Sequence, residues 1–226
     1  MTLTSPDLTM PFAGDDFTIC GAGETSMTWI KTIAPPEAEG RLGRIYDRVR
    51  GPDGDVDLIL QAHSLCPHSL EGHMALYKNV LHHTANRSPK WRLELVGVQV
   101  SLLNGCTYCV THHAVGLARA LGDEKRADDM LAALRTGDHT SFSAAEQAIL
   151  AYTEALTRHP DRVSEEMIGA MRQAGLGDAE ILETNQVAAY FAYANRTVLG
   201  LGVALEEAHI GRSPEDSDDI SQWHHR

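Results

Sequence analysis

Helical periodicity runs through most of this chain and restricts its fold more than any other feature. Between residues 35 and 208, apolar residues recur at spacings of three and four, and no segment shows the alternation of apolar and polar residues typical of a half-buried strand. The first such segment contains Leu42, Ile45, Tyr46 and Val49. The sequence therefore predicts an all-α protein folded as a helical bundle.

Capping residues and helix breakers divide this stretch into separate helices. One helix begins at Ser88-Pro89 and ends at an Asn-Gly pair, and Ser143 begins another with a capping box. Because these two helices begin alike, a domain built from two related helical halves remains open. Further helices are expected over residues 58–64, 67–83, 106–121, 123–134, 164–175 and 178–208.

The two ends of the chain lack this periodicity. Residues 1–35 are rich in Thr, Pro, Gly and Asp, which predicts an irregular N-terminal arm, and the polar residues 211–226 predict a C-terminal tail. Residues 36–210 are then one helical domain, long enough for a substantial core.

Charge and hydropathy exclude two classes of partner. The formal net charge is −12, which disfavours nucleic acid because the field of the molecule repels phosphates. No run approaches the roughly 18 apolar residues that a membrane span needs, and the N-terminal residues lack the pattern of a signal peptide. We therefore expect neither nucleic acid nor a membrane as a partner, and a cytoplasmic location.

Four cysteines are too few to staple a secreted domain, yet two of them are close together. Cys106 and Cys109 lie at the expected start of a helix, about 60° apart around its axis, so their sulfurs can form a disulfide. The free amides and positive dipole end of that helix favour a thiolate. We interpret the pair as redox-active, and Cys20 and Cys66 as small buried or loop residues.

Two further residues are placed to move protons at this pair. His113 follows Cys109 by four residues, so its ring lies on the same helix face, whereas His112 points about 100° away and is expected in solvent. Glu94 precedes the Asn-Gly turn by ten residues, so two antiparallel helices would bring its carboxylate beside His113.

Two questions about this site have alternative answers. The helix dipole favours Cys106 as the thiolate and a histidine base favours Cys109, and we follow the histidine. The four residues also formally complete a set of zinc ligands. Because zinc would occupy the groups that a redox cycle uses, and because Cys109 and His113 share one rigid helix, we predict no metal.

The spacing Glu94, eleven residues, Cys106, two residues, Cys109, three residues, His113 resembles the active-site motif of the AhpD-like alkylhydroperoxidases. These belong to the carboxymuconolactone decarboxylase family, and the likeness is closest to its peroxidase-related group, whose closing helix resembles residues 185–196. The resemblance spans roughly residues 40–210 and implies an AhpD-like helical bundle assembled as a homo-oligomer, either a trimer or a hexamer.

The resemblance also implies a role for each residue of the motif. Cys109 would be the peroxidatic cysteine, Cys106 the resolving cysteine, and His113 with Glu94 the proton relay. One branch of the family has a histidine where this sequence has Tyr108. Members without cysteines are lactone decarboxylases, an activity that the cysteine pair disfavours here.

The predicted function is thiol-dependent reduction of organic hydroperoxides in antioxidant defence. The partners would be a hydroperoxide substrate and an unidentified dithiol reductant, and no cofactor is expected because no motif for nucleotide, flavin or haem is present. The alternatives are a disulfide reductase or isomerase, and a non-enzymatic helical module that responds to redox state or zinc.

Overall fold

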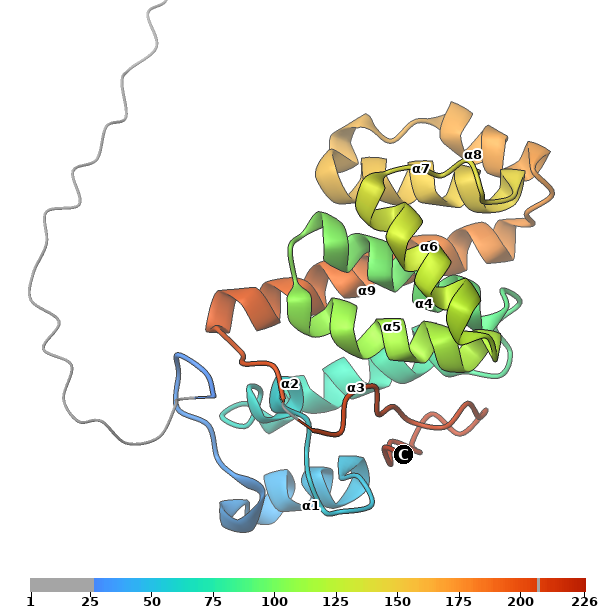
Figure 1. Ribbon diagram of the computed structural model, residues 1–226. Coiled ribbons are helices and arrows are strands. Elements are labelled where there is room, and N and C mark those ends of the chain that lie inside the picture. The colour runs from blue at the N-terminus through green and yellow to red at the C-terminus, as the bar shows by residue number, and fades with distance from the viewer. Residues whose placement is uncertain (1–26, 207) are drawn as a thin grey trace, which may run out of the picture.

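A computed structural model describes residues 27–206 and 208–226 of the chain, so most of the predicted N-terminal arm, with Cys20, lies outside the described residues. The described part consists of helices joined by loops, with two isolated β-bridges and no strand (Figure 1). The prediction of an all-α fold is confirmed. The helices are α1 (Gly40–Val49), α2 (Leu58–Gln61), α3 (Pro67–Leu81), α4 (Lys90–Leu103), α5 (Thr107–Leu121), α6 (Glu124–Thr136), α7 (Ala144–Arg158), α8 (Glu165–Gln173) and α9 (Asp178–Leu201), with 3-10 turns at Pro35–Glu37 and Pro160–Arg162.

Helix α4 lies at the centre of the bundle and packs against α5, α7 and α9. Its residues from Leu93 to Ser101 are all buried, which explains why its apolar residues are not confined to one face. A tight turn through Gly105, at a φ of 69°, reverses the chain into α5, so that α4 and α5 form an antiparallel hairpin. This hairpin positions the cysteine pair.

Helix α9 ends earlier than the sequence predicts. The periodic pattern continues to residue 208, but the helix stops at Leu201 because Gly202 adopts the left-handed conformation, with a φ of 60°. The indole ring of Trp29 lies directly against Gly202, where a side chain would collide with it. The chain then leaves the helix axis and folds back toward α2 and α3 (Figure 1).

The segment 211–226, interpreted from composition as a polar tail, lies against the helices. The Ser217 amide donates to the carbonyl of His82 at the end of α3, and Trp223 is buried beneath the guanidinium of Arg48 at 3.7 Å. Its polar residues therefore find partners in the body of the protein.

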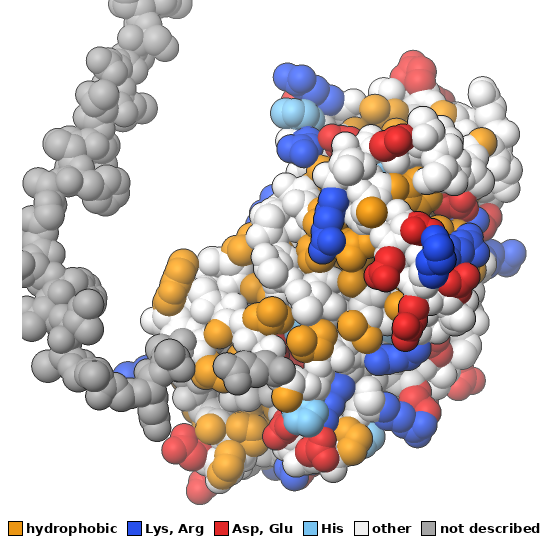
Figure 2. All heavy atoms as spheres, viewed as in Figure 1, with side chains coloured by type: hydrophobic (Ala, Val, Ile, Leu, Met, Phe, Trp, Pro, Cys, Tyr) orange, Lys and Arg blue, Asp and Glu red, His pale blue; other side chains and the backbone are white. Residues whose placement is uncertain are grey.

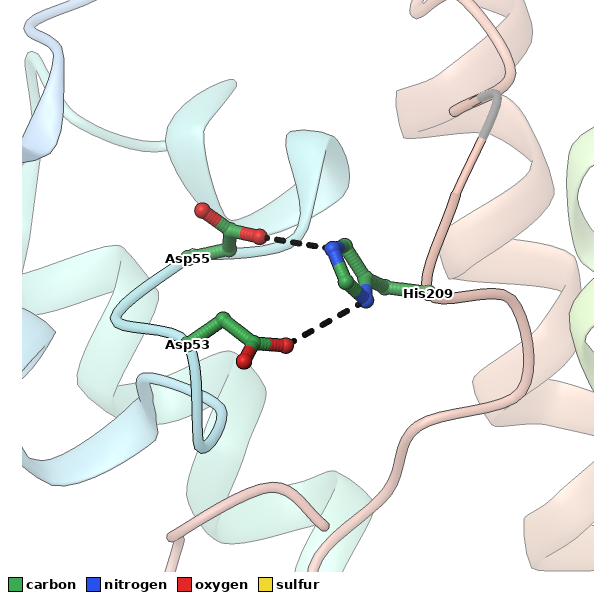
Figure 3. A group of neighbouring side chains, drawn as sticks. All are labelled: Asp53, Asp55 and His209. Carbon is green, nitrogen blue, oxygen red and sulfur yellow. Dashed lines mark ion pairs between the residues drawn. The ribbon is translucent and has the colours of Figure 1, made fainter.

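Ion pairs also attach the start of this segment to the loop between α1 and α2. His209 pairs with Asp53 at 3.5 Å and with Asp55 at 3.1 Å (Figure 3), and Arg212 pairs with Asp53 at 2.6 Å. Because Arg212 pairs with both carboxylates of this exposed cluster, we interpret the cluster as a structural attachment. No helix in the described ranges has the length and hydropathy needed to cross a bilayer.

The contact between α4 and α9 gives a test of the fold. A Cβ atom at Gly97 would overlap the buried ring of Phe191, whereas a Cβ at Gly72 in α3 meets nothing within 4 Å. We expect Gly97→Ala to lower the free energy of unfolding by about 1–3 kcal/mol, despite the better helix propensity of alanine. Gly72→Ala should raise it by up to about 1 kcal/mol. Urea unfolding followed by circular dichroism measures both, and a Gly97→Ala protein as stable as the parent would contradict the packing described.

Candidate active site

The cysteine pair lies in the first turn of α5. Cys106 is the N-cap residue and is fully buried, and Cys109 is 3% exposed. Both are free thiols. The arrangement follows from the local sequence, because Gly105 turns the chain and leaves the first amides of α5 without helical partners.

The two thiols share a hydrogen bond that gives them different acidities. The side chain and the amide of Cys109 both donate to the Cys106 sulfur, and together they lower the pKa of Cys106 although burial opposes this. Donating that hydrogen bond raises the pKa of Cys109 well above its usual value, and burial adds to the effect. Of the two thiols, Cys106 therefore loses its proton more readily, and Cys109 holds its proton more tightly.

A buried carboxylate and a histidine lie beside the pair. Nδ1 of His113 donates to Oε2 of Glu94 at 2.8 Å, which is the approach expected from an antiparallel α4–α5 hairpin. The carboxylate has room because residue 116 is glycine, where a Cβ atom would lie 3.0 Å from it. The bond to Nδ1 leaves Nε2 of His113 available for proton transfer.

Neighbouring positive charges keep Glu94 ionised. Burial alone would raise its pKa, but Lys90, 3.5 Å away, together with His113 and His82, lowers the pKa to about 2. The side chain is 3% exposed, so little solvent screens these interactions. Glu94 is therefore a permanent negative charge behind the His113 ring.

A small cavity of about 40 Å³ is lined by both Cys109 and His113. Its lining includes Cys109, His113, Tyr77 and Tyr190. The ring of Tyr77 stacks on Tyr190 and meets the edge of His113, with centroids 5.4 and 6.3 Å apart. Within the described residues, His113 and Cys109 share this cavity without a direct hydrogen bond.

The expectation that His112 lies in solvent is wrong. It is 7% exposed, stacks on Tyr108 and donates from Nε2 to Glu206 at 3.0 Å, while Nδ1 accepts from the amide of Gly211. The reason is that the segment after α9 folds over this face of α5. Helical geometry fixed the direction of the ring but could not predict what covers it.

Sequence reasoning did not identify several residues that complete the site. Glu206 accepts from the Tyr108 hydroxyl at 2.7 Å, and Asn195 hydrogen-bonds Cys109 in a way that partly offsets the rise in its pKa. Asp57 and His225 form a second carboxylate–histidine pair at the cavity. Asn195 lies in the closing-helix motif, whereas Glu206 and His225 have no motif that could reveal them.

The four residues weighed as zinc ligands do not converge on one point. The Glu94 carboxylate is bonded to the ring of His113 and not directed toward the sulfurs. Among the described residues, Asp53, Asp55 and His209 form a group whose possible ligand atoms all lie within 4.8 Å of one another. This cluster is exposed and does not include the cysteines. The geometry at the cysteines therefore fits thiol chemistry better than tetrahedral coordination.

Comparison with known proteins agrees with this fold. Residues 67–155 match the model of the Carboxymuconolactone decarboxylase family, and no curated protein matches the chain. An uncharacterized peroxidase-related protein from Silicibacter sp. TM1040 is 19% identical, with a TM-score of 0.66 over 82% of this chain and 95% of that one. A peroxidase-related protein from Ralstonia eutropha JMP134, with an alkylhydroperoxidase AhpD core, is 17% identical, with a TM-score of 0.66 over 81% and 95%. The debrominase Bmp8, solved in complex with 2,3,4-tribromopyrrole, is 16% identical, with a TM-score of 0.60 over 81% and 93%.

Two buried histidines make the stability of the protein depend on pH. Burial, with the nearby His63 and His225, lowers the pKa of His73 to about 3, and burial lowers that of His82 to about 4 although Asp216 opposes this. At a pH between these lowered pKa values and the ordinary histidine pKa of 6.5, the two histidines are protonated in the unfolded chain but not in the folded protein. The free energy of unfolding therefore falls as the pH falls through this range.

We expect each of these two histidines to lower the free energy of unfolding by about 2 kcal/mol between pH 8 and pH 5. In His73→Gln, the loss of stability over the same range should be about 2 kcal/mol smaller than in the parent. Urea unfolding at pH 5, 6.5 and 8 measures this difference. An equal loss in the parent and the variant would show that His73 is protonated in the folded protein.

Proposed function

From the match of residues 67–155 to the Carboxymuconolactone decarboxylase family and from the geometry of the site, we propose that this chain is an AhpD-like thiol peroxidase that reduces hydroperoxides. One observation supports the proposal above the others. Cys109, the second sulfur of the C-x-x-C pair, lines the same small cavity as a histidine that is hydrogen-bonded to a buried, ionised carboxylate.

In the first step of the proposed reaction, the thiolate of Cys109 attacks the terminal oxygen of the hydroperoxide. Once the pair has lost one proton, the negative charge reaches Cys109 when the proton of Cys109 passes to Cys106 along their shared hydrogen bond. A sulfur–oxygen bond forms, the O–O bond breaks, and the electron pair leaves on the alkoxide. His113, supported by Glu94, gives the alkoxide a proton, which yields an alcohol and a sulfenic acid on Cys109.

In the second step, Cys106 resolves the sulfenic acid. Its thiol condenses with the Cys109 sulfenic acid to form a disulfide and water. An external dithiol then reduces the disulfide by thiolate exchange and is itself oxidised. Because the pair begins and ends as a dithiol, the cycle requires a reductant and no bound cofactor, and it fits the reducing environment of the cytoplasm.

The site fits this cycle better than it fits the two alternatives. Cys109 is 3% exposed at a cavity of about 40 Å³, a size that suits attack on a small peroxide better than attack on a disulfide of a folded protein. A zinc-responsive module needs four converging ligand atoms, and Glu94 is bonded to His113 instead.

The proposal includes assembly into a homo-oligomer, a trimer or a hexamer. Hydrophobic side chains are exposed at several places on the face shown in Figure 2. The exposed apolar residues of the described part include Trp29 at 78%, Leu65 at 56% and Leu199 at 43%. A subunit interface would bury these side chains.

Substitution of the two cysteines separates the two steps. On mixing the reduced protein with hydrogen peroxide or cumene hydroperoxide, we expect the parent to lose two thiols as a Cys106–Cys109 disulfide. Cys109→Ser should lose none, and Cys106→Ser should stop at a sulfenic acid on Cys109 that dimedone traps. Mass spectrometry counts the products, with the exposed Cys66→Ser as the matched control. Unchanged thiols in the parent would refute the peroxidase and make zinc analysis the next experiment.

The proton relay is tested by Glu94→Gln. The amide keeps the shape of the side chain but removes the charge that orients His113, so we expect the rate of sulfenic acid formation to fall by roughly 10²-fold. His113→Gln should cause a similar loss, and because the two residues act as one unit, the double variant should lose little more. Stopped-flow measurement of the parent and the three variants completes a double-mutant cycle. If the fold-losses in rate of the two single variants multiply in the double variant, the two residues act independently.

A further inference from the structure

A second carboxylate–histidine pair lies at the same cavity, and nothing above gives it a role. Nδ1 of His225, the penultimate residue of the chain, lies 2.8 Å from Oδ2 of Asp57, which immediately precedes α2. The two residues are 168 positions apart in the sequence. Both line the cavity that contains Cys109 and His113.

The remaining nitrogen of His225 is buried without a partner. The side chain is 3% exposed, and Nε2 has no hydrogen-bond partner among the described residues. In the described part of the chain seven buried side-chain polar atoms lack a partner, and two of them, this nitrogen and Nδ1 of His73, belong to residues that line this cavity. An unpaired buried polar atom costs about 1–3 kcal/mol, so the cavity is built for a polar ligand.

Both histidines contact one ring of the aromatic wall. Tyr77 meets the edge of His113 at 6.3 Å between centroids and that of His225 at 6.5 Å. A cavity needs roughly 10–15 Å³ to hold one water, so about 40 Å³ accommodates hydrogen peroxide or a hydroperoxide with a short alkyl group. A large alkyl group does not fit while Arg212 and His225 close the cavity.

The position of His225 is fixed by the fold. Lys78 and His82 at the end of α3 bond to Glu215, Asp216 and Ser217, and Arg226 pairs with Glu215. The carboxylate of Asp57 sets the orientation of the ring, because Nδ1 donates to it and Nε2 is left as an acceptor. His225 is therefore held by Asp57 in the wall of the cavity that Cys109 also lines.

We propose that His225, oriented by Asp57, is a substrate-binding residue that accepts a hydrogen bond from the O–H of a small hydroperoxide and holds its terminal oxygen toward Cys109. This inference rests on the proposed peroxidase function and deepens it, since it assigns the binding of the attacked oxygen to His225 and leaves protonation of the departing oxygen to His113. No proton leaves His225 in this role, so the balance of the reaction is unchanged.

The test uses the full chain and a control at the adjacent position. His225→Gln and Asp57→Asn remove the acceptor or its orientation, while His224→Gln changes an exposed histidine one residue away. Stopped-flow mixing of the reduced proteins with hydrogen peroxide should give a second-order rate constant about tenfold lower in His225→Gln, lower in the same direction in Asp57→Asn, and unchanged in His224→Gln. Alkylation of Cys109 by iodoacetamide, which needs the thiolate but no bound O–H, should have the same rate in all four proteins.

Each outcome is decisive for this proposal. Equal peroxide rates in His225→Gln and the parent would overturn it and leave the peroxidase intact, whereas a parent whose thiols react with no peroxide would refute the peroxidase itself. An equal fall in the peroxide and alkylation rates would show that His225 only supports the structure. The parent should also react faster with hydrogen peroxide than with cumene hydroperoxide, and the opposite order would overturn the assignment of a small substrate.

Discussion

The arrangement of the site depends on one buried negative charge, the carboxylate of Glu94. An unpaired charge in the interior is very costly, so this side chain requires Lys90 on its own helix and His113 on the next. The need to pair this charge with His113 holds α4 close to α5. The carboxylate has room there because residue 116 is glycine, where a Cβ atom would lie 3.0 Å from it. The orientation of the His113 ring, and the direction of its second nitrogen, follow from this pairing.

In the first turn of α5, the more acidic sulfur and the sulfur that lines the cavity belong to different cysteines. Cys106 receives hydrogen bonds from the side chain and amide of Cys109, which stabilises its thiolate, but it is fully buried. Cys109 lines the cavity and keeps its proton at rest. The sulfur that the first turn of α5 makes more acidic is therefore not the sulfur that lines the cavity with His113.

Local physics made much of this structure predictable, and long-range contacts made the rest unpredictable. The capping box at Ser143 and the turn at Gly105 are decided by neighbours within a few residues, so pattern alone located these boundaries. The approach of Glu94 to His113 followed from a single hairpin. In contrast, Glu206 reaches His112 across 94 residues and His225 reaches Asp57 across 168, and no periodicity encodes such contacts. His112 was misjudged for this reason.

The C-terminal segment shows why composition is a poor guide to burial at an active site. Few large apolar residues and no period predict a tail, because such a segment cannot contribute to a hydrophobic core. A polar cavity has the opposite requirement, since its walls must supply hydrogen-bonding groups that are themselves held in place. Here Trp223 and the ion pairs of Arg212 attach the segment, and most of its buried polar groups are paired within the protein. Nε2 of His225 has no partner in the described part of the chain, and its place beside Cys109 is where a bound substrate would supply one.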